Sequence, residues 1–128
     1  MKFFIVPLFF LPSAFCCPDL SGNYQYCDLR KQSLVVKQNG NLYKMSHEKF
    51  IADGKVYHSE EYKGDSLISY DRMSECVGDH LIYHYRKRSD GYVVANFTYD
   101  FYKIENKMIK KSFGQILGFE LNETETCQ

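Results

Sequence analysis

The sequence lacks an excess of charge of either sign. Its 128 residues hold 16 Lys and Arg against 16 Asp and Glu. Nucleic-acid-binding domains normally show a marked basic excess, so this balance argues against a dedicated nucleic-acid partner. Tryptophan is also absent, whereas the chain has 11 Tyr and 10 Phe, so these two residue types supply all of its aromatic surface.

The chain also lacks an apolar run long enough to cross a bilayer. The longest run, from Phe3 to Phe15, is broken by Pro7 and Pro12, and a membrane span needs about 20 apolar residues. A lysine followed by a short apolar core and a small-residue exit is typical of a secretory signal. We predict a signal peptide over residues 1–16, no stable membrane span, and a single secreted or periplasmic domain over residues 17–128.

The chain has five cysteines, and an odd number leaves one without a disulfide partner in a secreted protein. Cleavage after Cys16 removes one and leaves an even set, which suits two disulfides in an oxidising compartment. The remaining four are Cys17, Cys27, Cys76 and Cys127. We predict the pairs Cys17–Cys127 and Cys27–Cys76, because closing a barrel brings the two chain ends together.

No stretch after the signal shows a convincing helical period, and only 114–121 is ambiguous. Short strand-like runs alternate instead with turn signals. Asn39-Gly40 and Asp53-Gly54, each between apolar runs, are strong hairpin signals because both positions tolerate positive φ angles. Further turns are predicted at 77–79, 89–91 and 105–106.

These runs predict an all-β fold. About eight to ten antiparallel strands, joined in order by tight turns, form an up-and-down meander. A sheet of that length and twist tends to close on itself, because closure removes its exposed edges. We therefore predict an up-and-down barrel, with a β-sandwich as the alternative.

Aromatic residues gather on one face of the two best predicted strands. Tyr83 and Tyr85 alternate with polar residues in one strand, and the odd-numbered residues from Val93 to Phe101 share a face of the next. Inward-facing rings with hydroxyl groups could line a cup that has apolar walls and hydrogen-bonding tips. The candidate ligand-binding residues are therefore Tyr83, Tyr85, Phe97, Tyr99 and Phe101.

Residues 64–67 read Gly-Asp-Ser-Leu, the signature of a hydrolase family, but the base that this chemistry needs is missing. A serine hydroxyl becomes a nucleophile when a nearby imidazole takes its proton. That family uses an Asp-x-x-His pair, and no Asp of this chain has a His three residues later. We interpret Lys63-Gly64-Asp65 as a turn and Ser66 as the start of a strand, and we predict neither enzymatic activity nor a cofactor.

His80 and His84 have the spacing of two zinc ligands on a helix. They lie in a predicted strand, however, where a rise of about 3.3 Å per residue separates them by roughly 13 Å. Two histidines at that distance do not share one ion, so no metal site is predicted.

Two basic clusters, 86–88 and 107–111, lie on consecutive predicted hairpins. They are either a docking patch for an anionic lipid, glycan or protein, or solvated strand ends, and the acidic residues among them favour the second interpretation. Two N-glycosylation sequons begin at Asn96 and Asn122. Asn96 is predicted to face solvent, and Asn122 to lie in a polar tail.

Residues Cys17–Tyr24 read Cys-Pro-Asp-Leu-Ser-Gly-Asn-Tyr. This start resembles that of an uncharacterised group of small secreted bacterial proteins, which begin Cys-Pro-x-Leu-Ser-Gly-x-Tyr. More distantly, Leu20–Tyr24 is similar to the Gly-x-aromatic first strand of the lipocalins (calycins), with Tyr24 in place of their Trp. The lipocalin C-terminal helix is missing. The resemblance implies a lipocalin-like barrel that carries a small apolar ligand.

Two hypotheses of function follow. In the first, the protein is a secreted, disulfide-bonded β-barrel that binds a small hydrophobic ligand. In the second, it is a protein- or surface-interaction module, such as an inhibitor or an envelope-associated factor, and side chains fill its interior. An internal pocket of about 300 Å³ or more favours the first hypothesis, and a filled interior favours the second.

Overall fold

The computed structural model describes residues 17–128, and the predicted signal peptide at 1–16 lies outside them. The described part folds into ten strands. They are β1 (Gly22–Cys27), β2 (Gln32–Asn39), β3 (Leu42–Met45), β4 (Glu48–Ile51), β5 (Val56–Lys63), β6 (Ser66–Val77), β7 (His80–Ser89), β8 (Tyr92–Ile104), β9 (Lys107–Ile116) and β10 (Phe119–Cys127). Within this part, no helix is long and apolar enough to cross a membrane.

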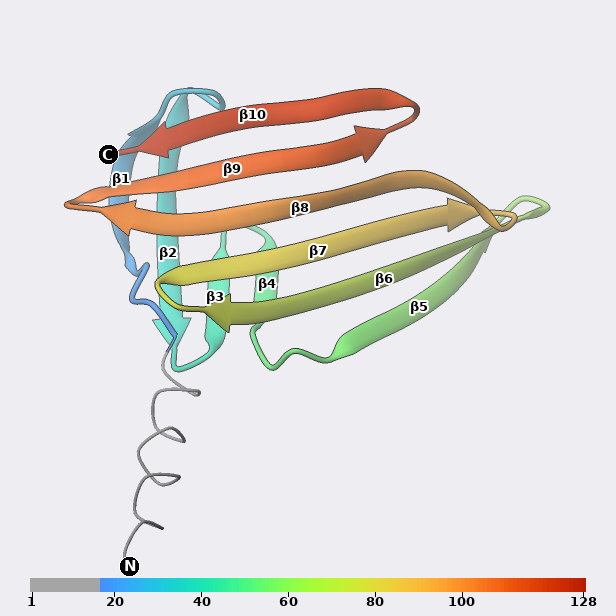
Figure 1. Cartoon of the computed structure of the whole chain (residues 1–128), viewed down its shortest axis with the longest axis horizontal. Helices are drawn as coiled ribbons and strands as arrows, with labels where there is room; N and C mark the ends of the chain where they lie inside the picture. The colour runs from blue at the N-terminus through green and yellow to red at the C-terminus, as the bar shows by residue number, and fades with distance from the viewer. Residues whose placement is uncertain (1–16) are drawn as a thin grey trace, which may run out of the picture.

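The ten strands form one antiparallel sheet in the order β4-β3-β2-β1-β10-β9-β8-β7-β6-β5. In Figure 1, β2, β3 and β4 cross behind β6–β10 at a steep angle, so the sheet folds back on itself. No ladder joins β4 to β5 among the described residues, and the sheet is not closed. The predicted all-β antiparallel meander is confirmed, but it forms neither the predicted closed barrel nor a sandwich of two separate sheets.

The sheet opens at the predicted Asp53-Gly54 hairpin. This turn connects β4 and β5, which are the two edges of the sheet. The Gly54 N–H donates to the carbonyl oxygen of Ser74 in β6, at 2.8 Å. Phe50 of β4 is buried, and its ring centroid lies 4.7 Å from that of Tyr83 and 5.6 Å from that of Phe101. Burial of this ring draws β4 across the inside of the fold and away from β5.

The other predicted turns each join two paired strands. Between β7 and β8, Asp90 and Gly91 have φ angles of 51° and 85°, as both central residues of a type I′ turn require. Ser66 is the first residue of β6, as interpreted from the sequence. The ambiguous stretch 114–121 forms the end of β9, the turn at 117–118 and the start of β10, and Asn122 lies within β10 rather than in a polar tail.

Two disulfides join the four predicted cysteines, but the predicted pairs Cys17–Cys127 and Cys27–Cys76 are wrong. The bonds are Cys17–Cys76 and Cys27–Cys127, with Cα–Cα distances of 5.3 and 4.0 Å. The first and last strands do meet, as predicted. However, β1 and β10 overlap only near their C-terminal ends, where Cys27 lies opposite Cys127. Cys17 therefore lies at the other end of β1, beside the end of β6.

The core lies between β1–β4 and the face of β6–β10 that is turned toward them. Its largest fully buried side chains are Tyr43, Leu20, Leu81, Met108, Cys27 and Cys127. The Tyr43 hydroxyl donates to the carbonyl oxygen of Pro18 at 2.6 Å, and burial raises the pKa of Tyr43 to about 12. Side chains therefore fill the space between the two portions of the sheet.

The disulfide pairing can be checked by peptide mapping without reduction, which should recover Cys17–Cys76 and Cys27–Cys127 links. The two bonds close loops of 59 and 100 residues. Replacing either pair by serine should therefore lower the free energy of unfolding by about 4 kcal/mol. Chemical denaturation of each double variant measures this loss. A fragment that links Cys17 to Cys127 would contradict the observed pairing.

Gly114 gives a second prediction about the fold. It lies opposite Phe97, and its φ angle is 139°. A Cβ atom there would lie 2.3 Å from the carbonyl oxygen of Asn96 and 2.6 Å from the Cα of Phe97. Gly114→Ala should cost about 3 kcal/mol of stability, because backbone strain adds to overpacking. Gly118→Ala, whose φ is 81° in open space, is the matched control and should cost less than half as much.

Candidate functional site

The long strands extend beyond the strands that cover them. In Figure 1, β5–β9 continue to the right past β4. We call the face of β5–β10 turned toward β1–β4 the inner face, and the opposite one the outer face. Beyond β4 the inner face carries a row of half-buried rings on β6, β7 and β8, which we call the aromatic shelf. Its members are Tyr70, Tyr85, Phe97 and Tyr99.

The five candidate ligand-binding residues do lie together on the inner face of β7 and β8. Tyr83 and Phe101 are 6% and 3% exposed and belong to the core, whereas Tyr85, Phe97 and Tyr99 are half-buried on the shelf. The Phe97 ring centroid lies 4.9 Å from that of Tyr85 and 4.8 Å from that of Tyr99. The Tyr99 centroid lies 5.6 Å from that of Tyr83 and 6.0 Å from that of Phe101, so core and shelf form one continuous row of rings.

Tyr70 belongs to this row, although its own strand gives no aromatic alternation. Its ring centroid lies 6.4 Å from that of Tyr85. Tyr70 pairs with Lys87, and the neighbouring Arg72 pairs directly with Tyr85. The register between β6 and β7 brings Tyr70 to the shelf, and that register follows from the turn at 78–79.

Three cations lie over the shelf. The Arg72 guanidinium carbon lies 5.2 and 5.5 Å from the ring centroids of Tyr70 and Tyr85. The Lys110 ammonium lies 4.1 Å from the centroid of Tyr99, and burial lowers the pKa of Lys110. The Lys87 ammonium lies 5.8 Å from the centroid of Tyr70. Within residues 17–128, none of these three cations is in an ion pair, so the shelf combines aromatic surface with positive charge.

The space beside the core rings is small. A hollow of about 140 Å³ opens between β4 and β6, and Tyr57 and Tyr83 are among the residues that line it. Pockets that hold drug-sized ligands are typically about 300 Å³ or larger. The hollow beside the core rings is smaller than this, and the rings beyond them lie on an open shelf.

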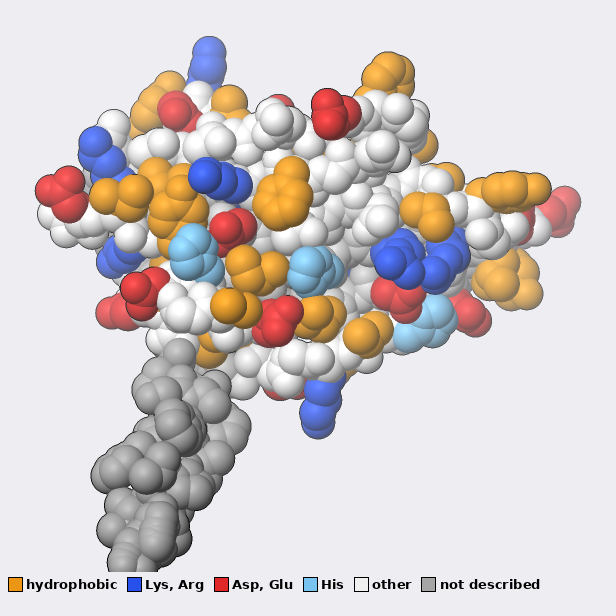
Figure 2. All heavy atoms as spheres, viewed as in Figure 1, with side chains coloured by type: hydrophobic (Ala, Val, Ile, Leu, Met, Phe, Trp, Pro, Cys, Tyr) orange, Lys and Arg blue, Asp and Glu red, His pale blue; other side chains and the backbone are white. Residues whose placement is uncertain are grey.

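The outer face carries charges of both signs among hydrophobic side chains, as Figure 2 shows. The carboxylate of Asp71 has a basic side chain on each oxygen: Nδ1 of His58 at 2.6 Å and Nη1 of Arg88 at 3.0 Å. Glu60 lies 3.1 Å from the other ring nitrogen of His58. The hydrogen bond to Asp71, and then that to Glu60, raises the pKa of His58, and the same bond to His58 lowers the pKa of Asp71.

The two histidines of β7 have different partners on the outer face. Nδ1 of His80 lies 2.6 Å from a carboxylate oxygen of Asp100, and Nδ1 of His84 lies 2.9 Å from the hydroxyl of Thr98. β7 is a strand, as the sequence predicted. Thr98 is the direct cross-strand partner of His84, whereas Asp100 lies opposite Ile82 and reaches His80 diagonally.

Neither predicted basic cluster forms a single patch. Arg86 and Arg88 pair with residues of the outer face, whereas Lys87 pairs with Tyr70 on the inner face. Lys110 and Lys111 also lie on opposite faces, since Lys110 pairs with Phe101 and Lys111 with Asp100. The strand alternation distributes both clusters over the two surfaces.

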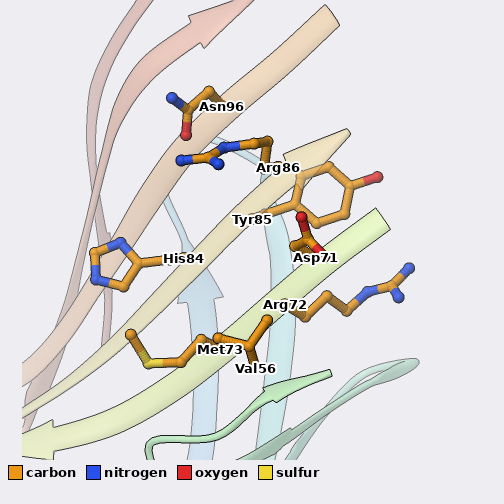
Figure 3. A pocket seen from close by; sticks show the side chains of 8 residues that line it. All are labelled: Val56, Asp71, Arg72, Met73, His84, Tyr85, Arg86 and Asn96. Carbon is orange, nitrogen blue, oxygen red and sulfur yellow. The ribbon is translucent and has the colours of Figure 1, made fainter. Parts of the chain in front are cut away.

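A groove of about 300 Å³ crosses β5–β8. Figure 3 shows its eight lining residues. The sequon residue Asn96 is one of them and is exposed, as predicted. The second sequon residue, Asn122, is exposed on β10.

No protein-family model, curated protein or solved structure matches this chain. The likeness of its start to secreted bacterial proteins and to lipocalins stays a prediction. What the chain does must therefore be inferred from the geometry of its two faces.

The pKa of His58 is directly measurable by NMR titration of its ring protons. Because Asp71 and Glu60 stabilise the imidazolium, the midpoint should lie above the usual value of about 6.5. A folded-state pKa that is raised contributes stability below pH ~6.5, and this contribution disappears as the pH rises through the folded pKa. Asp71→Asn should lower the midpoint more than Glu60→Gln does. An unchanged midpoint in Asp71→Asn would contradict this account of the network.

Proposed function

We propose that this protein is a secreted interaction module that binds a protein partner through its aromatic shelf. The compartment is inferred from the two disulfides, because such bonds persist in secreted and periplasmic proteins and are rare in the cytosol. The observation that carries the proposal is the row of rings, which continues beyond the core as half-buried surface. The cations that lie over it are in no ion pair among residues 17–128.

The shelf has the composition of a recognition surface. Tyrosine and arginine are enriched among the residues that dominate binding energy at protein interfaces, and contiguous apolar patches on monomers are often functional. Arg72 and Lys87 provide positive charge beside Tyr70 and Tyr85. The matching partner segment presents an apolar or aromatic side chain flanked by carboxylates.

A carrier of a small apolar ligand is the alternative, and the geometry favours it less. The interior between the two portions of the sheet is filled, and the hollow beside Tyr83 is about 140 Å³. An apolar ligand would have to lie on the open shelf, against Tyr85, Phe97 and Tyr99. Ligand sites usually bury most of a small molecule's surface, which an open shelf does not do.

Selection from a displayed random-peptide library tests the proposal. Peptides enriched on the wild-type protein should combine Asp or Glu with Phe, Leu or Trp. Tyr85→Ser and Arg72→Gln should each weaken the best peptide at least tenfold, roughly 1.4 kcal/mol. Tyr26→Ser is the matched control, because this tyrosine is 46% exposed on β1, away from the shelf. Equal binding to the wild type and to Tyr85→Ser would contradict the proposal.

An apolar fluorescent dye separates the module from the carrier. If the protein is a module with a filled interior, the wild type should not bind the dye tightly, and Tyr99→Ala should lower the melting temperature because the ring packs against the core. Tight dye binding by the wild type that is lost in a folded Tyr99→Ala variant would favour the carrier instead. Thermal melting of the variant shows whether it is folded.

A further inference from the structure

The groove on the outer face is built from two neighbouring cross-strand rows. One row runs from Val56 through Met73 to His84, and the next contains Asp71, Arg86 and Asn96. The side chains of Arg72 and Tyr85, which also border the groove, project away from His84 and Met73 in Figure 3. The groove and the aromatic shelf therefore lie on opposite faces of the same strands.

Arg86 does not form an ion pair with the acidic residue of its cross-strand row. Its direct cross-strand neighbour is Asp71, but both oxygens of that carboxylate are already occupied, by His58 and by Arg88. Arg86 is exposed, and it is in no ion pair among residues 17–128. A guanidinium offers five donors in a planar fork that matches a carboxylate or a phosphate. Arg86 is therefore free to bind an anion.

Two polar side chains lie on either side of this guanidinium. In Figure 3 it extends between the amide of Asn96 and the imidazole of His84. Thr98 engages Nδ1 of His84 at 2.9 Å, which fixes the ring and leaves Nε2 as the second possible contact. Asn96 can donate two further hydrogen bonds. Arg86 and Asn96 are direct cross-strand neighbours, and His84 lies two residues from Arg86 on the same face of β7.

The rest of the groove suits an apolar group. Val56 and Met73 line it beside His84, and Val56 is 65% exposed. The only carboxylate among the lining residues is Asp71, and its two oxygens are bound to His58 and to the guanidinium of Arg88. Glu60 lies beyond His58, to which it is bonded. The hollow of about 300 Å³ is at the lower limit for a small-molecule site.

We propose that this groove binds a small organic oxyanion, a carboxylate or a phosphate monoester with a compact apolar body. The oxyanion accepts hydrogen bonds from the fork of Arg86, the amide of Asn96 and the ring of His84, while the apolar body lies on Met73 and Val56. This site is independent of the proposed interaction through the shelf, because its side chains leave the sheet on the other face.

NMR titration of the full secreted protein with phenyl phosphate, benzoate, inorganic phosphate and benzyl alcohol tests the site. Phenyl phosphate or benzoate should shift the amide signals of residues 71–73, 84–86 and 96 with a Kd below about 1 mM. Inorganic phosphate lacks the apolar body and benzyl alcohol lacks the charge, so both should bind at least tenfold more weakly. The tighter of the two aromatic anions identifies the class of oxyanion.

Matched variants locate the binding. Arg86→Gln should weaken the tighter anion at least tenfold, in keeping with the loss of a charge-assisted hydrogen bond. Lys111→Gln, on the same face but outside the groove, and Lys87→Gln, on the shelf, should each change the Kd less than twofold. Since all three side chains lie on the surface of the sheet, the melting temperatures should agree with that of the wild type.

Three results would overturn the proposal. They are equal affinity in Arg86→Gln and the wild type, equal binding of benzyl alcohol and phenyl phosphate, and the absence of shifts at Met73, His84, Arg86 and Asn96. None of these results bears on peptide binding by the shelf, which depends on Tyr85 and Arg72. The two proposals can therefore fail separately.

Discussion

The junction of the first and last strands is the constraint on which the rest of the fold depends. Cys27 and Cys127 are covalently joined there, and main-chain hydrogen bonds link Tyr26 to Gln128 on one side of the bond. Glu125, 4% exposed, accepts hydrogen bonds from both the main chain and the guanidinium of Arg30. A buried carboxylate is stable only when its partners are in place. The junction therefore holds the first and last strands in the middle of the sheet.

The central position of β1 and β10 determines where the sheet opens and which part of its inner face stays exposed. Because β1 and β10 occupy the centre, the edges are β4 and β5, which are neighbours in sequence. The strands near the first edge are short, with four residues each in β3 and β4, whereas β6 and β8 have 12 and 13. Four-residue strands cannot cover strands three times their length. The aromatic shelf is the part of the inner face that this mismatch leaves exposed.

The sequence predicts the strands well, because alternation and turn residues are local signals. It places the aromatic residues from Ala95 to Phe101 on the correct face, but a bulge sets Val93 opposite Arg88, so Val93 lies on the outer face and is 53% exposed. The opening at Asp53-Gly54 and the disulfide pairing were not predictable. Both depend on how strands that are distant in the sequence are staggered, and on the burial of Phe50 against β7 and β8. Neither of these is visible as a local pattern of residues in the sequence.

The same alternation explains how one short basic run can serve two surfaces. Arg86, Lys87 and Arg88 are consecutive, yet Lys87 lies over Tyr70 on the inner face, and Arg88 is bound to Asp71 on the outer face. Of the three, only Arg86 lines the groove, and it is in no ion pair among residues 17–128. A patch formed by all three side chains would require them to share a face, which a strand with a two-residue period forbids. Instead, Lys87 lies on the shelf, Arg88 is in an ion pair and Arg86 lines the groove. Each of the three cations therefore has a different set of neighbours.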